Sequence, residues 1–185
     1  MIDAGDLRKG TTVEVDGVLY QVLDFQHIKI GRGSAQVRMK LKDIRAGHIT
    51  ERVVQAGTKF SRARVERQPA QYLYADGDLH HFMNTETYDQ IALNTEQLGD
   101  ALPYLSENAT CQLLTHGSEA IGIELPAAVE LKVAQTDPWV RGDTAQGGTK
   151  PARLETGMTV QVPLFINTGD RVKVDTRSGD YLGKA

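Results

Sequence analysis

Five cations lie close together in one short stretch of this sequence, residues 27–42, which reads HIKIGRGSAQVRMKLK. They are Lys29, Arg32, Arg38, Lys40 and Lys42. The stretch holds no carboxylate, although the whole chain of 185 residues has a net charge of −3. Clustered cations without acids are typical of a surface that binds a polyanion. The stretch is therefore the strongest candidate for a binding site, and RNA is the ligand that it favours.

Arg32 lies between Gly31 and Gly33 and is followed by the small Ser34. A guanidinium stays protonated in proteins, so it cannot act as an acid or base, but its flat fork of donors fits phosphate oxygens. Glycines on both sides let the backbone approach a ligand closely. The absence of nearby aromatic residues argues against stacking on single-stranded bases and favours contacts to folded RNA. The alternative is a flexible, solvated turn.

The residues around Arg32 predict the element that carries it. Val37, Met39 and Leu41 alternate with the cations of residues 38–42, which is the pattern of a strand with one buried face. We therefore expect a two-stranded hairpin with Arg32 at its tip. Arg38, Lys40 and Lys42 then lie on the outer face of one arm, where they can support contacts to an RNA backbone.

Strand patterns dominate the rest of the chain and predict an all-β fold. The Asp16-Gly17 pair is a strong signal for a hairpin turn between residues 11–15 and 18–23. Short strands within residues 1–64 indicate an SH3-like barrel, with a generic β-meander as the alternative. Two later groups of short strands suggest two barrels of the OB type. Residues 85–91 are expected to form a short helix or turn, with Thr85 as its N-cap.

Charge divides the chain into three blocks. Residues 1–64 hold 12 Lys or Arg and 7 Asp or Glu, a net charge of +5; residues 65–128 hold 1 and 10, a net charge of −9. Residues 129–185 hold 8 and 7, a net charge of +1. Blocks that differ this much indicate separate modules, of which only the first suits a polyanion. An acidic middle block favours oriented docking over coating of RNA.

Enzyme, metal and cofactor motifs are not found, so we expect no catalytic residue, no metal site and no cofactor. His80 and His81 are adjacent, and on a strand they point to opposite faces, so they cannot chelate one metal together. Lys150 ends a glycine-rich stretch but precedes Pro151, which a nucleotide-binding loop would not allow. Cys111 lies in an apolar run and is expected to be a small buried hydrophobe. One cysteine suits the cytosol, and neither a secretory signal nor a membrane span is predicted.

Three segments resemble one known family, bacterial translation elongation factor P. They are the KxGRGxA hairpin (residues 29–35), QYLYADGD with HFMNTETYDQI (residues 71–91), and the stretch from GDTAQGGTK to DYLG (residues 142–183). The resemblance covers the whole chain and implies three domains. These are an SH3-like, KOW-type barrel at 1–64, an acidic OB domain at 65–128 and a C-terminal OB domain at 129–185, arranged as an L that mimics tRNA.

The same resemblance implies a cytoplasmic, monomeric, non-enzymatic factor that binds both ribosomal subunits between the P and E sites. There it would stimulate peptide-bond formation on stalled sequences, above all consecutive prolines, by positioning the acceptor end of the P-site peptidyl-tRNA. Arg32 would contact that end, with Lys29, Gly31, Gly33 and Ser34 in support. Two loops would face the ribosome: Gly99, Asp100 and Ala101 in the second domain, and Gly142, Asp143 and Thr144 in the third.

The sequence departs from the family pattern near the tip. Many members carry a lysine there that receives an extension, and one subgroup carries a rhamnosylated arginine. Arg32 excludes lysine-directed modification, and Ile30 stands where proline is common in modified members. Arg32 is thus either unmodified or the substrate of a modifying enzyme. The alternatives to the main reading are a general OB-type RNA-binding protein, the paralogous elongation-factor-P-like protein, and an enzyme with a concealed site.

Overall fold

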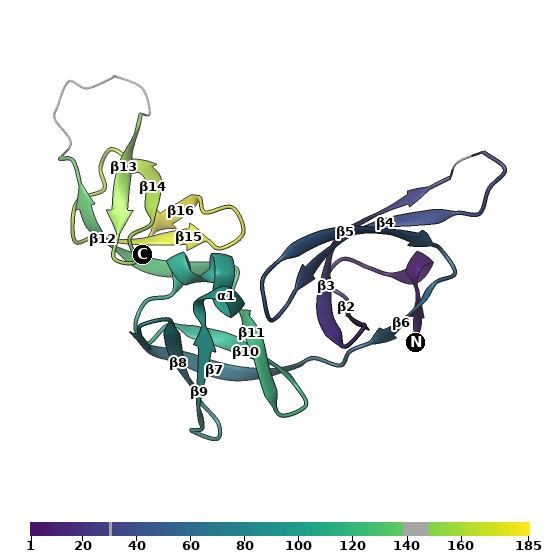
Figure 1. The fold of residues 1–185 in the computed structure, drawn as a ribbon. Coiled ribbons are helices and arrows are strands. Elements are labelled where there is room, and N and C mark those ends of the chain that lie inside the picture. Colours follow the sequence, from purple (N-terminus) through teal and green to yellow (C-terminus); the bar gives the residue numbers. More distant parts are fainter. Residues whose placement is uncertain (30, 139–147) are drawn as a thin grey trace. The chain divides into compact units, whose positions relative to one another are not determined.

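The computed structural model describes residues 1–29, 31–138 and 148–185, and the fold of these residues is all-β (Figure 1). Its strands form three curled sheets, one of six strands and two of five. These sheets confirm the all-β class. No helix in the described part of the chain is long and apolar enough to cross a membrane.

The first sheet has the strand order β1-β6-β2-β3-β4-β5. Its strands are β1 (Ile2–Asp3), β2 (Thr12–Val15), β3 (Val18–Ile28), β4 (Gln36–Asp43), β5 (Ile49–Gln55) and β6 (Lys59–Arg62), and a 3-10 helix (Ala4–Asp6) follows β1. β2 and β3 are joined by Asp16 and Gly17, whose φ angles of 53° and 79° allow the two-residue turn that matches strand twist. The predicted hairpin turn is confirmed. The sheet curls around a core that includes Val13, Val22 and Met39.

The second sheet has the order β11-β10-β7-β8-β9. Its strands are β7 (Glu66–Asp76), β8 (Leu79–Asn84), β9 (Gln90–Asn94), β10 (Thr110–His116) and β11 (Glu119–Glu124). Between β9 and β10 lie α1 (Thr95–Leu98) and a 3-10 helix (Gly99–Tyr104). Asn94 caps the start of α1, because its side chain accepts from Gln97 N at 2.8 Å, while Gln97 Oε1 accepts from Asn94 N at 3.0 Å.

The third sheet has the order β14-β13-β12-β15-β16. Its strands are β12 (Ala128–Thr136), β13 (Thr149–Leu154), β14 (Thr159–Pro163), β15 (Arg171–Asp175) and β16 (Tyr181–Lys184). Alternate residues on these strands, such as Leu131, Ala152 and Val172, are fully buried in one core. This period of two is what a sheet with one buried face requires.

The structure corrects one local expectation and shows one strand with an unusual residue. Residues 85–87 form a turn that is capped by Asn84, not by Thr85, because Asn84 Oδ1 accepts from the backbone of Glu86 at 2.8 Å and of Thr87 at 3.1 Å. β13 contains Pro151, which is unusual within a sheet. The β12 pairing ends at Ala152, so no ladder bond from Pro151 to β12 is needed.

The chain divides into two compact units. Unit 1 consists of Met1–Gln68, Leu93–Gly99 and Leu113–Gly122, and unit 2 consists of Pro69–Ala92, Asp100–Gln112 and Ile123–Ala185. Unit 1 therefore contains the whole first sheet together with short segments from later in the sequence. The domain boundaries expected from the sequence, 1–64, 65–128 and 129–185, differ from these units and stay a prediction.

Within unit 1, the first sheet is joined to the later segments by apolar and ionic contacts. Leu19 and Ala63 pack with Ile121 in a small buried cluster. Arg45 extends from a turn that Asp43 fixes by accepting from the backbone of residues 45 and 46. Its guanidinium donates a hydrogen bond to each carboxylate oxygen of Glu119, from Nε to Oε1 at 2.8 Å and from Nη2 to Oε2 at 2.7 Å. This bidentate geometry is the strongest form of the Arg–carboxylate pair.

Glu119→Gln should lower stability in a pH-dependent manner. The hydrogen bond from Arg45 lowers the pKa of Glu119 in the folded chain, so its contribution is present above the ordinary value of 4.5 and is lost as the pH falls through the folded pKa. Both side chains are more than one-third exposed, which limits the contribution at pH 7 to about 0.2–1 kcal/mol. Urea unfolding of both proteins at several pH values measures the difference.

The matched control is Glu130→Gln, an exposed carboxylate on β12, which should change stability by less than about 0.5 kcal/mol throughout. A difference between the wild type and Glu119→Gln that stays constant from neutral to acidic pH would contradict the role assigned to the ion pair.

Candidate nucleic-acid interface

The hairpin of β3 and β4 carries the cationic stretch and projects from the rest of the first sheet (Figure 1). β4 pairs with β3 on one side and with β5 on the other. Val37, Met39 and Leu41 of β4 are fully buried, whereas Arg38 and Lys40 are exposed. The predicted alternation is confirmed, and a packed core fixes which face of β4 the cations occupy.

A β-bulge at Leu23 determines which side chains of β3 reach the outer face. Pairing runs from Val22 with Leu41 directly to Asp24 with Lys40, so Leu23 is an extra residue. Strict alternation after the buried Val22 would turn Asp24 toward the core. The bulge instead leaves Asp24 exposed and lets Phe25 pack against the core. One inserted residue thus keeps a carboxylate out of the apolar interior.

The tip of the hairpin presents Arg32 to solvent. Lys29, Gly31, Arg32, Gly33 and Ser34 are all exposed. Gly31 has a φ of 58° and its surroundings are open, so this position needs a glycine for its backbone and not for lack of space. The described tip residues therefore lie in one exposed segment, with Arg32 open to solvent. Ile30 lies outside the described residues.

The outer face of the hairpin is less cationic than the sequence suggests. Lys40 pairs across the sheet with Asp24 on β3 and with Glu51 on β5, so a carboxylate flanks it on each side. Neither carboxylate forms an ion pair with Lys40 in the described part of the chain. Residues 27–42 give no sign of these neighbours, because both Asp24 and Glu51 lie outside that stretch of the sequence. Only the strand register reveals them.

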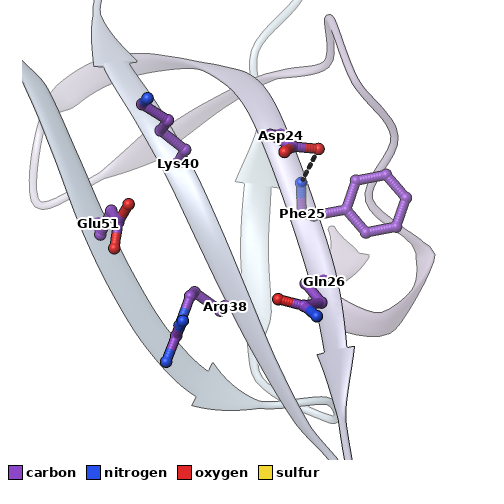
Figure 2. Close-up of a pocket in the computed structure, with 6 residues that line it drawn as sticks. All are labelled: Asp24, Phe25, Gln26, Arg38, Lys40 and Glu51. Atoms are coloured by element: carbon purple, nitrogen blue, oxygen red, sulfur yellow. Dashed lines mark hydrogen bonds between the residues drawn. The ribbon is translucent and has the colours of Figure 1, made fainter.

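Arg38, by contrast, has uncharged cross-strand neighbours, Gln26 and Val53. A shallow pocket of about 250 Å³ lies over this region (Figure 2). Its lining residues are Asp24, Phe25, Gln26, Arg38, Lys40 and Glu51. In Figure 2, Lys40 lies between Asp24 and Glu51, and the ring of Phe25 points away from the charged side chains. Sequence reasoning missed Asp24, Gln26 and Glu51 as parts of this site.

Lys42 lies in a different environment from the other two cations of β4. It is half-buried, and its Nζ lies 3.6 Å from where a side chain on Gly99 would begin. Both residues belong to unit 1. The structure thus brings together two residues that the sequence assigned to separate contact regions. Lys42 is correspondingly less available to an external polyanion than Arg38.

The predicted loop at Gly99, Asp100 and Ala101 is helical rather than irregular. These residues begin the 3-10 helix Gly99–Tyr104, directly after α1. Asp100 is exposed and Ala101 is half-buried. The sequence signal for this helical segment is the capping box of Asn94 and Gln97, which starts α1 immediately before it. Gly142, Asp143 and Thr144 lie outside the described residues.

The cysteine and the adjacent histidines lie in surroundings that suit structural roles. Cys111 is buried, which raises the pKa of its thiol to about 11 and keeps it protonated at neutral pH, so it is the predicted small hydrophobe. His80 and His81 alternate between the buried and half-buried faces of β8, as expected. Burial lowers the pKa of His80, and His81 stacks on Tyr74 at 4.5 Å. Among the described residues, no group of three His, Cys, Asp or Glu could hold a metal.

Removing Leu23 should straighten the hairpin without changing its pairing. Deletion leaves a regular strand in which Asp24 stays outside and Phe25 still faces Met39, but the bend that a bulge introduces is lost. Cross-strand NOEs between residues 25 and 39 should persist. The control is deletion of Gln26, where no bulge exists; it should replace the His27–Val37 pairing. Loss of the 25–39 contacts on deletion of Leu23 would contradict the assignment of the bulge.

Comparison with known proteins accounts for this architecture. The chain matches three family models: the elongation factor P KOW-like domain at residues 3–60, the elongation factor P OB domain at 65–123 and the elongation factor P C-terminal domain at 129–184. It is also similar in fold to a eukaryotic translation initiation factor 5A from Methanococcus jannaschii, with a TM-score of 0.52 and 24% identity. That match covers 68% of this chain and 90% of the other.

Sequence relatives agree along the full length. Elongation factor P from Moorella thermoacetica is 56% identical over 185 residues, all of both chains. Elongation factor P from Lachnoclostridium phytofermentans is 53% identical over 182 residues, 98% of both chains, and that from Pelotomaculum thermopropionicum is 52% identical over the same span. With an all-β fold whose first sheet carries a protruding basic hairpin, this chain belongs to the elongation factor P family of translation factors.

Proposed function

We propose that the protein binds the ribosome between the P and E sites and stimulates peptide-bond formation when translation stalls, above all on consecutive prolines. The exposed Arg32 at the end of a protruding hairpin is the observation that carries this proposal. Its planar guanidinium can donate to the phosphates of the peptidyl-tRNA acceptor end. The small Gly31, Gly33 and Ser34 leave room for that contact, and Lys29 supports it as a second cation beside Arg32.

The mechanism we propose is positional and supplies no chemical group, so the protein is not itself an enzyme. The ribosome carries out peptide transfer, and proline is a stiff reactant that reaches the attack geometry with difficulty. Holding the tRNA end lowers the entropic cost of that geometry, because a misplacement of about 1 Å can cost on the order of 100-fold in rate. The buried face of the hairpin supports this role, since a tip held by a packed core can fix its ligand.

Contacts away from the tip would orient the factor on both ribosomal subunits. We assign the exposed Asp100 and the neighbouring Gly99 and Ala101 to one such contact, and residues 142–144 to another. The excess of acids in residues 65–128 favours contact at these points over general coating of RNA. On this proposal the protein acts as a monomer in the cytoplasm.

Arg32→Ala should abolish most of the stimulation. In a purified translation assay on a Pro-Pro-Pro template, we expect peptide synthesis to fall close to the rate without the factor. Arg32→Lys should restore only part of it, because a point charge replaces a planar fork. Arg62→Ala, an exposed arginine of the same sheet, serves as the control and should retain activity. Full rescue by Arg32→Ala would overturn the assignment of the tip.

We further propose that Arg32 acts without modification, because Ile30 departs from the proline that is common beside modified tips. Intact-mass measurement of protein from its native host should give the mass of the sequence, 20.3 kDa. An added deoxyhexose that maps to Arg32 would instead identify a modifying enzyme as a partner, and would show that the reach of the guanidinium is extended by a sugar.

A further inference from the structure

We propose that the outer face of β3, β4 and β5 binds a single RNA base that carries an exocyclic amino group, with the attached phosphate on Arg38. This inference rests on the proposed function, because it takes RNA to lie along the hairpin. The site is the pocket over Arg38 and Lys40, on the arms of the hairpin and distinct from its tip (Figure 2).

The strand register arranges the polar groups in two rows. Asp24, Lys40 and Glu51 form one row across the three strands, and Gln26, Arg38 and Val53 form the next. Strands are about 4.8 Å apart, and successive residues on one face are about 7 Å apart along a strand. Donors and acceptors are therefore spaced over an area comparable to one nucleotide. A fixed grid of this kind can distinguish ligands by their hydrogen-bonding groups.

The charged side chains of the two rows are available to a ligand. No ion pair within the described residues joins Asp24, Lys40, Glu51 or Arg38 to a neighbour. Asp24 accepts from the backbone N–H of Phe25 at 3.0 Å through one carboxylate oxygen, which restrains the group and leaves the second oxygen open. Opposite charges are therefore cross-strand neighbours here without a direct ion pair between them in the described part of the chain.

Two carboxylates beside the central lysine are unsuited to a phosphodiester backbone. A phosphodiester has no hydrogen to donate, and Asp24 and Glu51 would repel it. An exocyclic amino group, in contrast, donates to a carboxylate, while ring nitrogens and carbonyls accept from Lys40 or Gln26. The pocket therefore fits a base edge better than a phosphate, and the phosphate of the same nucleotide is left for Arg38, which has no acid as a cross-strand neighbour.

An apolar residue lies beside the pocket, next to Arg38 in the strand register. Val53 is 52% exposed on β5, in the same row as Arg38. A β-branched side chain on an open sheet face offers van der Waals contact to a flat ring, and no aromatic platform is needed for a single base. Unstacked bases read through hydrogen bonds on their edges are the usual target of sequence-specific RNA binding.

The test compares two nucleotides that differ at one ring position. Cytidine 5′-monophosphate carries an amino group where uridine 5′-monophosphate carries a carbonyl oxygen. Each is titrated into the full chain labelled with ¹⁵N, with inorganic phosphate as the third ligand. We expect the amide signals of residues 24, 38 and 51 to shift with the cytidine nucleotide, with an affinity at least about fivefold above that for the uridine nucleotide.

Variants separate the two halves of the site. Replacing both acids (Asp24→Ala with Glu51→Ala) should abolish the preference for cytidine and strengthen phosphate binding, since the repulsion is removed. Arg38→Gln should weaken both nucleotides. The control is Glu14→Ala, an exposed carboxylate on β2, which should leave the preference unchanged.

Three results would overturn the inference: equal affinity for the two nucleotides, shifts at Arg38 with phosphate that the bases do not strengthen, or no shift at residues 24, 38 and 51. The second would reduce the site to an anion contact, and the third would leave this face to a protein partner. The titration contains no ribosome, so its outcome does not depend on the outcome of the polyproline assay with Arg32→Ala. Failure of this inference can therefore be told apart from failure of the proposed function.

Discussion

The position of β4 between two antiparallel neighbours is the constraint on which the rest of the hairpin depends. Val37, Met39 and Leu41 are fully buried on one face of this strand. Their burial stabilises the sheet and also fixes the orientation of every residue between them, because side chains alternate with a period of two. The cations of the outer face are therefore placed by the core and not by their own interactions. A shift of one residue would exchange the two faces.

The core-determined register also explains how the hairpin can hold charges that do not pair. Exposed ion pairs contribute little to stability, so the fold loses little when Lys40, between Asp24 and Glu51, forms no ion pair within the described part of the chain. Arg45 and Glu119 show the opposite case, because their bidentate contact links segments far apart in the sequence. In unit 1 the Arg45–Glu119 ion pair thus joins distant segments, whereas no ion pair among the described residues holds Asp24, Arg38, Lys40 or Glu51 on the projecting arm.

Much of this fold could be predicted from local patterns. The Asp16-Gly17 turn, the alternation in residues 37–42 and the opposite faces of His80 and His81 each follow from a rule with a short range. Asp24 and Glu51 could not be found in this way, because their proximity to Lys40 depends on a bulge and on pairing between strands. The helical segment at Gly99 was missed for a different reason. The capping box of Asn94 and Gln97 that precedes it can be recognised in the sequence, but it is short and lies between two strand patterns.

The bulge at Leu23 has a consequence for how such a hairpin can change in length. Beyond it, β3 and β4 pair regularly up to Ile28 and Gln36. Adding one residue to each arm would keep the pairing but turn all residues nearer the tip to the opposite face. Only an even number of added pairs preserves both faces, and each such step moves Arg32 outward by about 7 Å. The distance that Arg32 reaches can therefore change only in steps of this size. Smaller changes in its position have to come from the bend at Leu23 or from the loop itself.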